Sequence, residues 1–195
     1  MERFLNDNDY VSRFFMHCTD IPGDHIKNTM DMIVRSFKYR LERQVRGKCK
    51  SYLNSHEHKD KDFDSFISDL TSNDLDEGLK TKGSLFLRNR DKDGKQLLIF
   101  DVKKHVKGVV PMEDMQKVFL YFLERIDREN EDGMVTIVFD CQGCGLKNMD
   151  MEFIRYMIDV LKDYFPQVLN YILVLDMPWV LNGKSSWWVV YFFTI

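Results

Sequence analysis

Two cysteines separated by two residues are the first positions whose types and spacing suggest chemistry. Cys141 and Cys144 flank Gln-Gly, and this spacing is typical of a redox dithiol or of half a zinc site. The other two cysteines, Cys18 and Cys49, have no second paired motif, so a complete set of four zinc ligands is not indicated. We therefore interpret Cys141 and Cys144 as small residues that follow a buried strand, and we rank a redox or metal protein last among the alternatives.

Two further motifs imitate binding loops for calcium and for phosphate, and each lacks a required residue. The stretch 89–94 (Asn-Arg-Asp-Lys-Asp-Gly) opens like a calcium loop, but its twelfth position is Phe100, where a bidentate glutamate is needed. The stretch 183–185 (Gly-Lys-Ser) ends like a phosphate loop, but Pro178 occupies the earlier glycine position and has no amide hydrogen. Neither site is predicted, and Asp93-Gly94 instead favours a tight hairpin.

The histidines do not define a site either. His56 and His58 lie in a charged run without apolar periodicity, so their side chains have no fixed geometry for a metal. The sequence has no Gly-x-Ser-x-Gly motif, and none of its five histidines can be paired with a nucleophile. The sequence therefore predicts a protein that is not an enzyme and that carries no metal or cofactor.

Composition and charge narrow the class of protein. The chain has 195 residues, of which 44% are hydrophobic, and this is enough for one ordinary domain with a small accessory subdomain. A net charge of -3 provides no concentrated basic surface for phosphates, so nucleic acid is not an expected partner. No signal-like start and no run of roughly 20 apolar residues occurs. These features predict a soluble, cytoplasmic protein with reduced thiols.

The amino-terminal part of the chain is predicted to be helical. Apolar spacing predicts a helix over Tyr10–Cys18, and Asp24 can cap a second helix. Residues 43–62 are charged and nearly without apolar periodicity, which favours a solvated connection and a subdomain boundary. The apolar stripe expected to face the core from the second helix consists of Ile26, Met30, Ile33, Val34 and Phe37.

Short apolar runs and longer amphipathic stretches alternate in the remainder of the chain. The runs 84–87 and 96–102 predict two antiparallel strands. The elements expected next are a helix between Pro111 and Glu131, a strand over Met134–Phe139, a helix over Asp150–Tyr164 and a buried strand over Tyr171–Leu175. This order predicts an α/β fold with an amino-terminal helical subdomain followed by a mixed β-sheet flanked by helices.

Six short stretches resemble parts of a known family. They are Asp9–Phe15, Ser36–Arg40, Asp91–Phe100, Thr136–Asp140, Asp163–Pro166 and Ile172–Trp179. In this order they resemble the amino-terminal helices, the opening hairpin, the central strand, a helix end and the following strand of the CRAL-TRIO lipid-binding domain family. The resemblance covers residues 1–182 and is weakest across 43–83.

The resemblance implies a non-enzymatic module that encloses a lipid or other hydrophobic small molecule in an apolar pocket between the sheet and the helices. It also implies lipid transfer at a transient membrane surface, with a cytoplasmic location that is peripheral at the endoplasmic reticulum or other endomembranes. A protein partner is not indicated. From the faces of the predicted strands and helices, we expect the ligand contacts to come from Leu98, Phe119, Phe139, Phe153 and Met157.

The chain is expected to have four segments. They are a helical amino-terminal subdomain (1–54), connecting helices (55–83), a partial lipid-binding domain that resembles CRAL-TRIO (84–182) and an atypical apolar tail (183–195). We expect a truncated or replaced carboxyl end, because Gly183-Lys184-Ser185 could be encoded by a splice-donor pattern and the tail would then be translated intron. The chain would then be a truncated isoform.

One alternative function is kept beside lipid binding. The domain would then be a protein-interaction or membrane-recruitment module without bound lipid, which presents a basic run or the apolar tail to a surface. The basic run is Lys103-Lys104-His105-Val106-Lys107. Binding through this run would weaken with added salt, because salt screens exposed charges.

Overall fold

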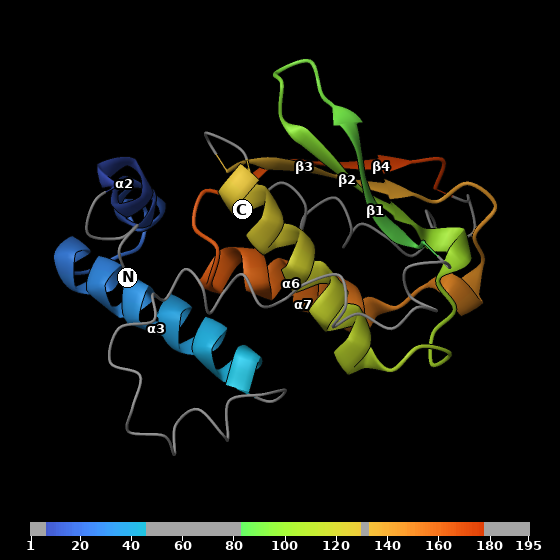
Figure 1. Ribbon diagram of the computed structural model, residues 1–195, viewed down its shortest axis with the longest axis horizontal. Coiled ribbons are helices and arrows are strands. Elements are labelled where there is room, and N and C mark those ends of the chain that lie inside the picture. The colour runs from blue at the N-terminus through green and yellow to red at the C-terminus, as the bar shows by residue number, and fades with distance from the viewer. Residues whose placement is uncertain (1–6, 46–82, 130–132, 178–195) are drawn as a thin grey trace, which may run out of the picture. The chain divides into compact units, whose positions relative to one another are not determined.

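The computed structural model describes residues 7–45, 83–129 and 133–177 of the chain (Figure 1). The chain divides into two compact units. The first unit comprises Met1–Asp74 and Asp159–Gln167, and the second comprises Leu75–Ile158 and Val168–Ile195. Most of the predicted connecting segment and the whole apolar tail lie outside the described residues. The four predicted segments stay a prediction.

The first unit is built on two helices, α2 (Asn8–His17) and α3 (His25–Val45), as the sequence predicts. An aspartate precedes each helix and caps it. The Asp7 carboxylate accepts a backbone N–H of the first turn of α2 at 2.9 Å, and Asp24 does the same for α3 at 3.1 Å. Gly23 between the helices has a φ of 109°, a conformation that favours glycine.

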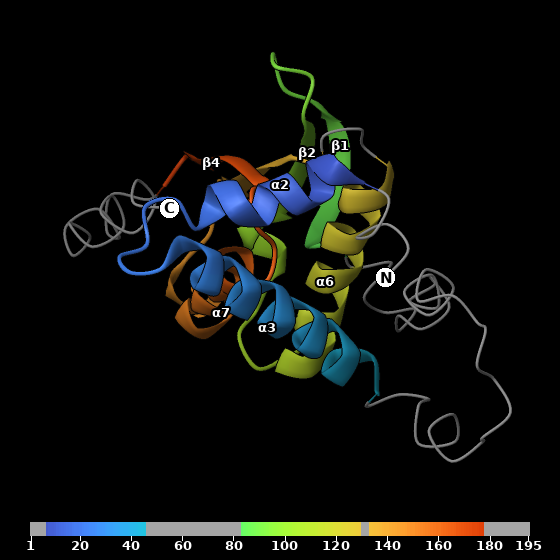
Figure 2. The ribbon, with the colours of Figure 1, turned by 90° about the vertical axis from the view of Figure 1, so that its left-hand side faces the viewer.

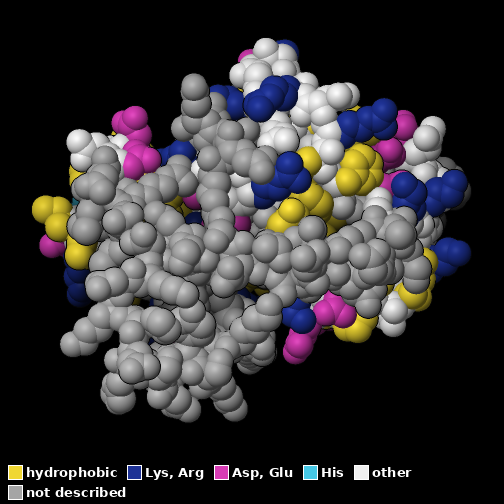
Figure 3. All heavy atoms as spheres, in the orientation of Figure 1, with side chains coloured by type: hydrophobic (Ala, Val, Ile, Leu, Met, Phe, Trp, Pro, Cys, Tyr) yellow, Lys and Arg dark blue, Asp and Glu magenta, His cyan; other side chains and the backbone are white. Residues whose placement is uncertain are grey.

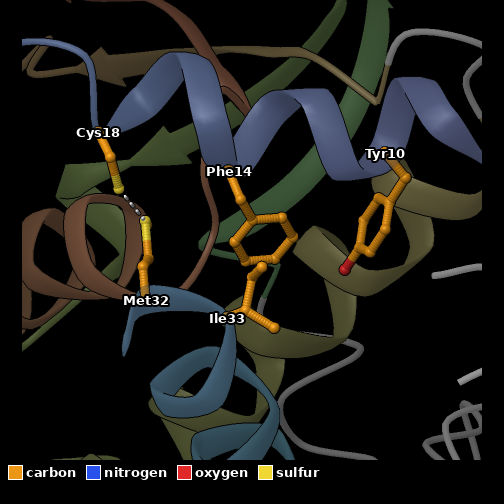
Figure 4. Close-up of a cluster of buried hydrophobic side chains, with 5 residues drawn as sticks. All are labelled: Tyr10, Phe14, Cys18, Met32 and Ile33. Carbon is orange, nitrogen blue, oxygen red and sulfur yellow. Dashed lines mark hydrogen bonds between the residues drawn. The ribbon is translucent and has the colours of Figure 1, made fainter. Parts of the chain in front are cut away.

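The core of the first unit forms where α2 packs on α3. Figure 4 shows its five buried side chains, Tyr10, Phe14, Cys18, Met32 and Ile33. The rings of Tyr10 and Phe14 meet edge to face with their centroids 5.5 Å apart, a favourable geometry for aromatic pairs. Cys18 Sγ lies 3.7 Å from Met32 Sδ. Cys18 is therefore a core residue.

The predicted apolar stripe of α3 is wrong in its register. Ile26, Met30 and Val34 are exposed, and of the five predicted residues only Ile33 is buried. The buried face of α3 instead consists of Thr29, Met32, Ile33, Ser36 and Arg40. The reason is tertiary, because α2 and the segment Asp159–Gln167 contact a side of α3 that includes polar residues.

Polar residues of α3 hold the turn that follows α7. The Ser36 hydroxyl donates a hydrogen bond to the Tyr164 carbonyl at 2.6 Å, and the Arg40 guanidinium donates to the same carbonyl at 3.0 Å and to Ser36 Oγ. The guanidinium also lies 4.1 Å from the centre of the Phe165 ring, and Tyr39 stacks on Tyr164. Two stretches that carry the family resemblance thus meet in this unit.

The second unit contains one mixed sheet of four strands in the order β1-β2-β3-β4 (Figure 1). The β1–β2 pair is antiparallel, whereas β2–β3 and β3–β4 are parallel. The hairpin between β1 and β2 turns at Gly94, where φ is 79°. The strands are β1 (Leu85–Arg90), β2 (Gln96–Asp101), β3 (Val135–Asp140) and β4 (Leu169–Leu175).

Two amphipathic helices supply the crossover connections of the sheet. Helix α6 (Met112–Glu129) joins β2 to β3, and α7 (Met151–Asp163) joins β3 to β4. Both lie on the same side of the sheet in Figures 1 and 2, where they cover one of its faces. Two short helical turns follow the strands β2 and β3, namely η2 (Val102–Lys104) and η3 (Leu146–Asn148).

The predicted α/β class, with amino-terminal helices followed by a mixed sheet flanked by helices, is confirmed. The predicted stripe of α6 is also buried at Met115, Phe119 and Ile126. None of the described helices combines the length and the apolar character that crossing a membrane requires.

Candidate functional site

The five residues predicted to contact a ligand lie between the sheet and its two helices. All are at most 5% exposed, and they are Leu98 on β2, Phe139 on β3, Phe119 on α6, and Phe153 and Met157 on α7. The rings of Phe119 and Phe153 lie edge to face, and Phe100 contacts both Phe139 and Phe153. This packing is that of a core, so contact with a ligand would require a helix to move. Their role in ligand binding stays a prediction.

The opposite face of the sheet, which we call the outer face, also carries apolar side chains. Their register places Phe86, Ile99, Val138 and Leu173 in one row across all four strands. Tyr171 and Leu175 lie at alternate positions of β4 and therefore share the face with Leu173. In Figures 1 and 2, no described helix of the second unit lies on this side of the sheet.

The prediction that β4 is a buried strand is wrong for one of its faces. Tyr171, Leu173 and Leu175 are 52%, 45% and 48% exposed, whereas Ile172 and Val174 between them are half-buried. The continuous apolar run of β4 predicts burial on both faces. Helices cover only one face of β4, so the apolar side chains of its other face are exposed. The apolar run in the sequence therefore indicates an exposed apolar face only once the positions of the helices are known.

A polar network joins the β1–β2 hairpin to the beginnings of β3 and β4. Asp91 Oδ2 accepts the Thr136 hydroxyl at 2.6 Å and the Asn170 amide at 3.1 Å. Its Oδ1 accepts the backbone N–H groups of Asp93 and Lys95. The Thr136 hydroxyl, followed by these N–H groups and Asn170, holds the pKa of Asp91 below its usual value. The carboxylate thus closes the hairpin turn and holds it to β3 and β4.

Asp91→Asn should make stability less dependent on acid. The pKa of Asp91 is lower in the folded chain than in the unfolded chain, so the carboxylate adds stability above about pH 4 and loses that contribution as the pH falls through the folded value. The urea midpoints of the wild-type protein and the variant should differ most between about pH 5 and 7, because an aspartate with the ordinary pKa of about 3.9 is ionised there in the unfolded chain as well. The two midpoints should converge in stronger acid. Asp93→Asn removes one charge from the same turn and is the control. A difference that persists unchanged in stronger acid would contradict the role of Asp91.

A buried histidine–aspartate pair lies beyond the other end of the strands. His105 Nε2 donates to Asp150 Oδ2 at 3.1 Å, and both side chains are almost completely buried. Asp150 Oδ1 also accepts the Phe153 backbone N–H in the first turn of α7, and the Asn148 amide donates to the His105 carbonyl at 2.7 Å. The prediction that His105 belongs to an exposed basic run is therefore wrong, because its ring lies in the interior.

Cys141 and Cys144 are both buried in the loop after β3. Burial, together with the neighbouring thiol of Cys144, raises the pKa of Cys141 to about 12, and burial raises the pKa of Cys144. A thiol with a raised pKa forms little thiolate near neutral pH, and the thiolate is the nucleophile and metal ligand. These values favour the interpretation of both cysteines as core residues over a redox or metal site.

The described residues contain no group of three or more histidine, cysteine, aspartate or glutamate side chains that could hold a metal ion. His56, His58 and the stretch 183–185 lie outside the described residues.

Comparisons with known proteins agree with the fold. A CRAL-TRIO domain-containing protein of Schizosaccharomyces pombe is 22% identical over 164 residues, which are 83% of this chain and 34% of the relative. The chain therefore spans about a third of the length of this curated relative. The crystal structure of Sfh5 superimposes with a TM-score of 0.59 at 14% identity, over 97% of this chain and 64% of that chain.

A protein-family comparison covers most of the second unit. The CRAL/TRIO domain model matches residues 80–193, a range that contains the whole sheet, α6 and α7. The match continues past Asn182, where the resemblance in the sequence was expected to end. Because the matched range is more than half of the chain and the described fold agrees with it, the chain belongs to the CRAL/TRIO domain family, whose members typically bind lipophilic ligands.

Proposed function

We propose that this domain is a non-enzymatic carrier that binds a lipophilic ligand against the outer face of its sheet. The single observation that supports this placement is the exposure of Tyr171, Leu173 and Leu175 on one face of β4. Leu173 lies in register with Val138, Ile99 and Phe86, of which Val138 is buried and the other two are half-buried. An exposed apolar strand face of this kind is typical of a ligand or interaction site.

The physical gain comes from removing apolar surface from water. Each square ångström of apolar surface that is covered contributes roughly 25 cal/mol, so an acyl chain lying across several strands gains several kcal/mol. The three exposed side chains lie along one strand, which suits an elongated apolar molecule. Asp101 and Asp140 lie in register with Leu175, one row beyond Ile99 and Val138, and they set a polar limit to the apolar face on β2 and β3.

The five interior residues are the alternative ligand site. Leu98, Phe119, Phe139, Phe153 and Met157 face the helices, so a ligand beside them would have to replace core contacts. On the outer face, Tyr171, Leu173 and Leu175 can be contacted without such a rearrangement. We therefore place the ligand there and expect the interior residues to support the sheet from behind.

Two finer parts of the proposal extend the family assignment. We expect the carrier to transfer its lipid between membranes, at the cytoplasmic side of endoplasmic reticulum or other endomembranes. We also expect it to resemble in function the CRAL-TRIO domain of motile sperm domain-containing protein 2. That likeness rests on four stretches, Val102–Lys107, Phe122–Arg125, Asp150–Arg155 and Asp176–Asn182.

Leu173→Glu should reduce the lipid that co-purifies with the full chain by about tenfold or more. Full burial of a leucine side chain contributes about 1.5–3 kcal/mol, and the introduced carboxylate must also be desolvated. The measurement is mass spectrometry of an organic extract of native, folded monomer, with lipid expressed per mole of protein.

Met30→Glu is the matched control, because Met30 is 54% exposed on α3 and should retain wild-type lipid content. Equal lipid in folded Leu173→Glu protein would contradict the outer face as the ligand site. A wild-type protein that is folded but empty would contradict lipid carriage itself and favour the recruitment module without bound lipid.

A further inference from the structure

We infer that the loops after β2 and β3 form a docking surface for an anionic lipid bilayer. This loop surface consists of three exposed lysines and three exposed apolar residues, namely Lys103, Lys107, Lys147, Val109, Leu146 and Met151. The inference goes beyond carriage of a ligand, because it concerns where the folded protein meets a membrane. It does not require a bound lipid.

Hydrogen bonds fix the two loops side by side. The buried Asn148 amide donates to the carbonyls of Lys103 at 3.0 Å and His105 at 2.7 Å. The Lys107 backbone N–H donates to the Lys147 carbonyl at 3.1 Å. Asn148 Oδ1 accepts the Gly145 N–H, which closes the short turn η3. Lysines separated by about forty residues are therefore held on one surface, and no unfolding is needed to bring them together.

The charges of these lysines remain available to a partner. Lys103, Lys107 and Lys147 are exposed and form no ion pair with a described residue. Lys104 differs, because it lies 3.1 Å from Asp101, and it is therefore left out of the loop surface. The nearest acidic residue of α7 that is exposed is Glu152, whereas Asp150 is buried against His105. In residues 102–111 and 141–152, the exposed charged side chains are four lysines and one glutamate, so positive charge predominates.

Apolar side chains stand out among these lysines. Leu146 is 74% exposed and Val109 is 62% exposed, although the backbone around them is held by the bonds described above. In Figure 3, Lys and Arg side chains gather with hydrophobic ones at the right-hand edge, where Figure 1 shows the short yellow-green and orange segments that follow β2 and β3. Basic and apolar side chains at one site are the combination that an anionic membrane interface favours.

The combination distinguishes a bilayer from other anionic partners. Phosphates of a nucleic acid would interact with the lysines but would leave Leu146 and Val109 in water. At a bilayer, the ammonium groups lie at the headgroups while the leucine enters the boundary with the acyl chains. Single exposed leucines are common on protein surfaces. Leu146 differs because it adjoins Lys147 on a surface with three exposed lysines, and this position is what indicates a membrane contact.

The charge test uses the full chain and phosphatidylcholine vesicles prepared with and without phosphatidylserine. Neutralising Lys103, Lys107 and Lys147 with glutamine should lower partition onto the anionic vesicles by about a hundredfold at low salt, since each lysine near such a surface contributes about fivefold. Added salt should reduce this difference, because it screens the attraction. The control neutralises Lys27, Arg88 and Lys92, which are exposed elsewhere, and should lower partition much less.

The apolar test uses a pair of matched variants. Leu146→Ser should weaken partition at high salt as well as at low salt, because insertion of the leucine is not screened. Ile26→Ser is its control, since Ile26 is 71% exposed on α3. A cooperative thermal unfolding transition is measured for each variant to check that the variant is folded.

Three results would overturn the inference. They are absence of wild-type binding to anionic vesicles, equal binding to phosphatidylcholine alone, and an equal loss in the control variants. If the lysines bind only an acidic protein, the wild-type chain will not bind anionic vesicles, and the inference is overturned. Lipid content, measured on the same preparations, tests ligand carriage separately, so lysine variants that retain lipid but leave the vesicles would show the two properties to be independent.

Discussion

Replacing Phe153 with alanine should lower the free energy of unfolding of the full chain by about 3–5 kcal/mol. The Phe153 side chain is completely buried on α7, and its ring contacts those of Phe100, Phe119 and Tyr156. Removal of the ring leaves a cavity between the helices and the sheet as well as losing the transfer free energy of its atoms. Because whole domains are stable by only about 5–15 kcal/mol, the variant should be close to unfolding.

Urea unfolding monitored by circular dichroism measures this change, and Phe15→Ala is the control. Phe15 is 46% exposed on α2, so its truncation should cost much less. A small loss of stability in Phe153→Ala, together with a loss of co-purifying lipid, would instead show that Phe153 lines a ligand cavity. The experiment therefore distinguishes between two roles of the interior residues, as core residues and as ligand contacts.

Asp150→Ala should destabilise the chain by about 2–4 kcal/mol. It removes the side-chain cap of α7, which contributes about 1 kcal/mol, and leaves the buried His105 Nε2–H without its acceptor at a further cost of about 1–3 kcal/mol. The same loss removes the direct side-chain bond between the loop that contains His105 and the beginning of α7. Urea midpoints at neutral pH measure the change.

Two controls separate the cap from the buried pair. Asp24→Ala removes an exposed cap from α3 and should cost only about 1 kcal/mol. Asp150→Asn keeps an oxygen that can accept the Phe153 N–H, and its amide can donate to Nε2 of the other His105 tautomer, so this variant should be milder than Asp150→Ala. Equal losses in Asp24→Ala and Asp150→Ala would contradict a stabilising role for the contact with His105.

The types and order of the elements followed from local patterns. Helix caps at Asp24 and a turn at Asp93-Gly94 depend on residues a few positions apart, and both occur in the structure. Apolar periodicity in α6 likewise predicts which of its sides is buried. Such interactions require no knowledge of distant parts of the chain, which is why the α/β class and the mixed sheet could be predicted.

The choice of buried face depended on tertiary structure. Ile26, Met30 and Val34 on α3 are apolar but exposed, since the neighbouring elements pack against the side with Ser36 and Arg40. Polar contacts between residues far apart in sequence, such as His105 with Asp150, have no local signature.

The position of the candidate ligand surface also depended on tertiary structure. The sequence by itself determined that β4 is a continuous apolar strand, and with it the expectation of an apolar site. Only the tertiary structure decided which of its side chains are exposed, because α6 and α7 both pack on the face that carries Phe139. Strand residues alternate between two faces that are equally apolar here, so their pattern cannot distinguish the covered face from the outer one.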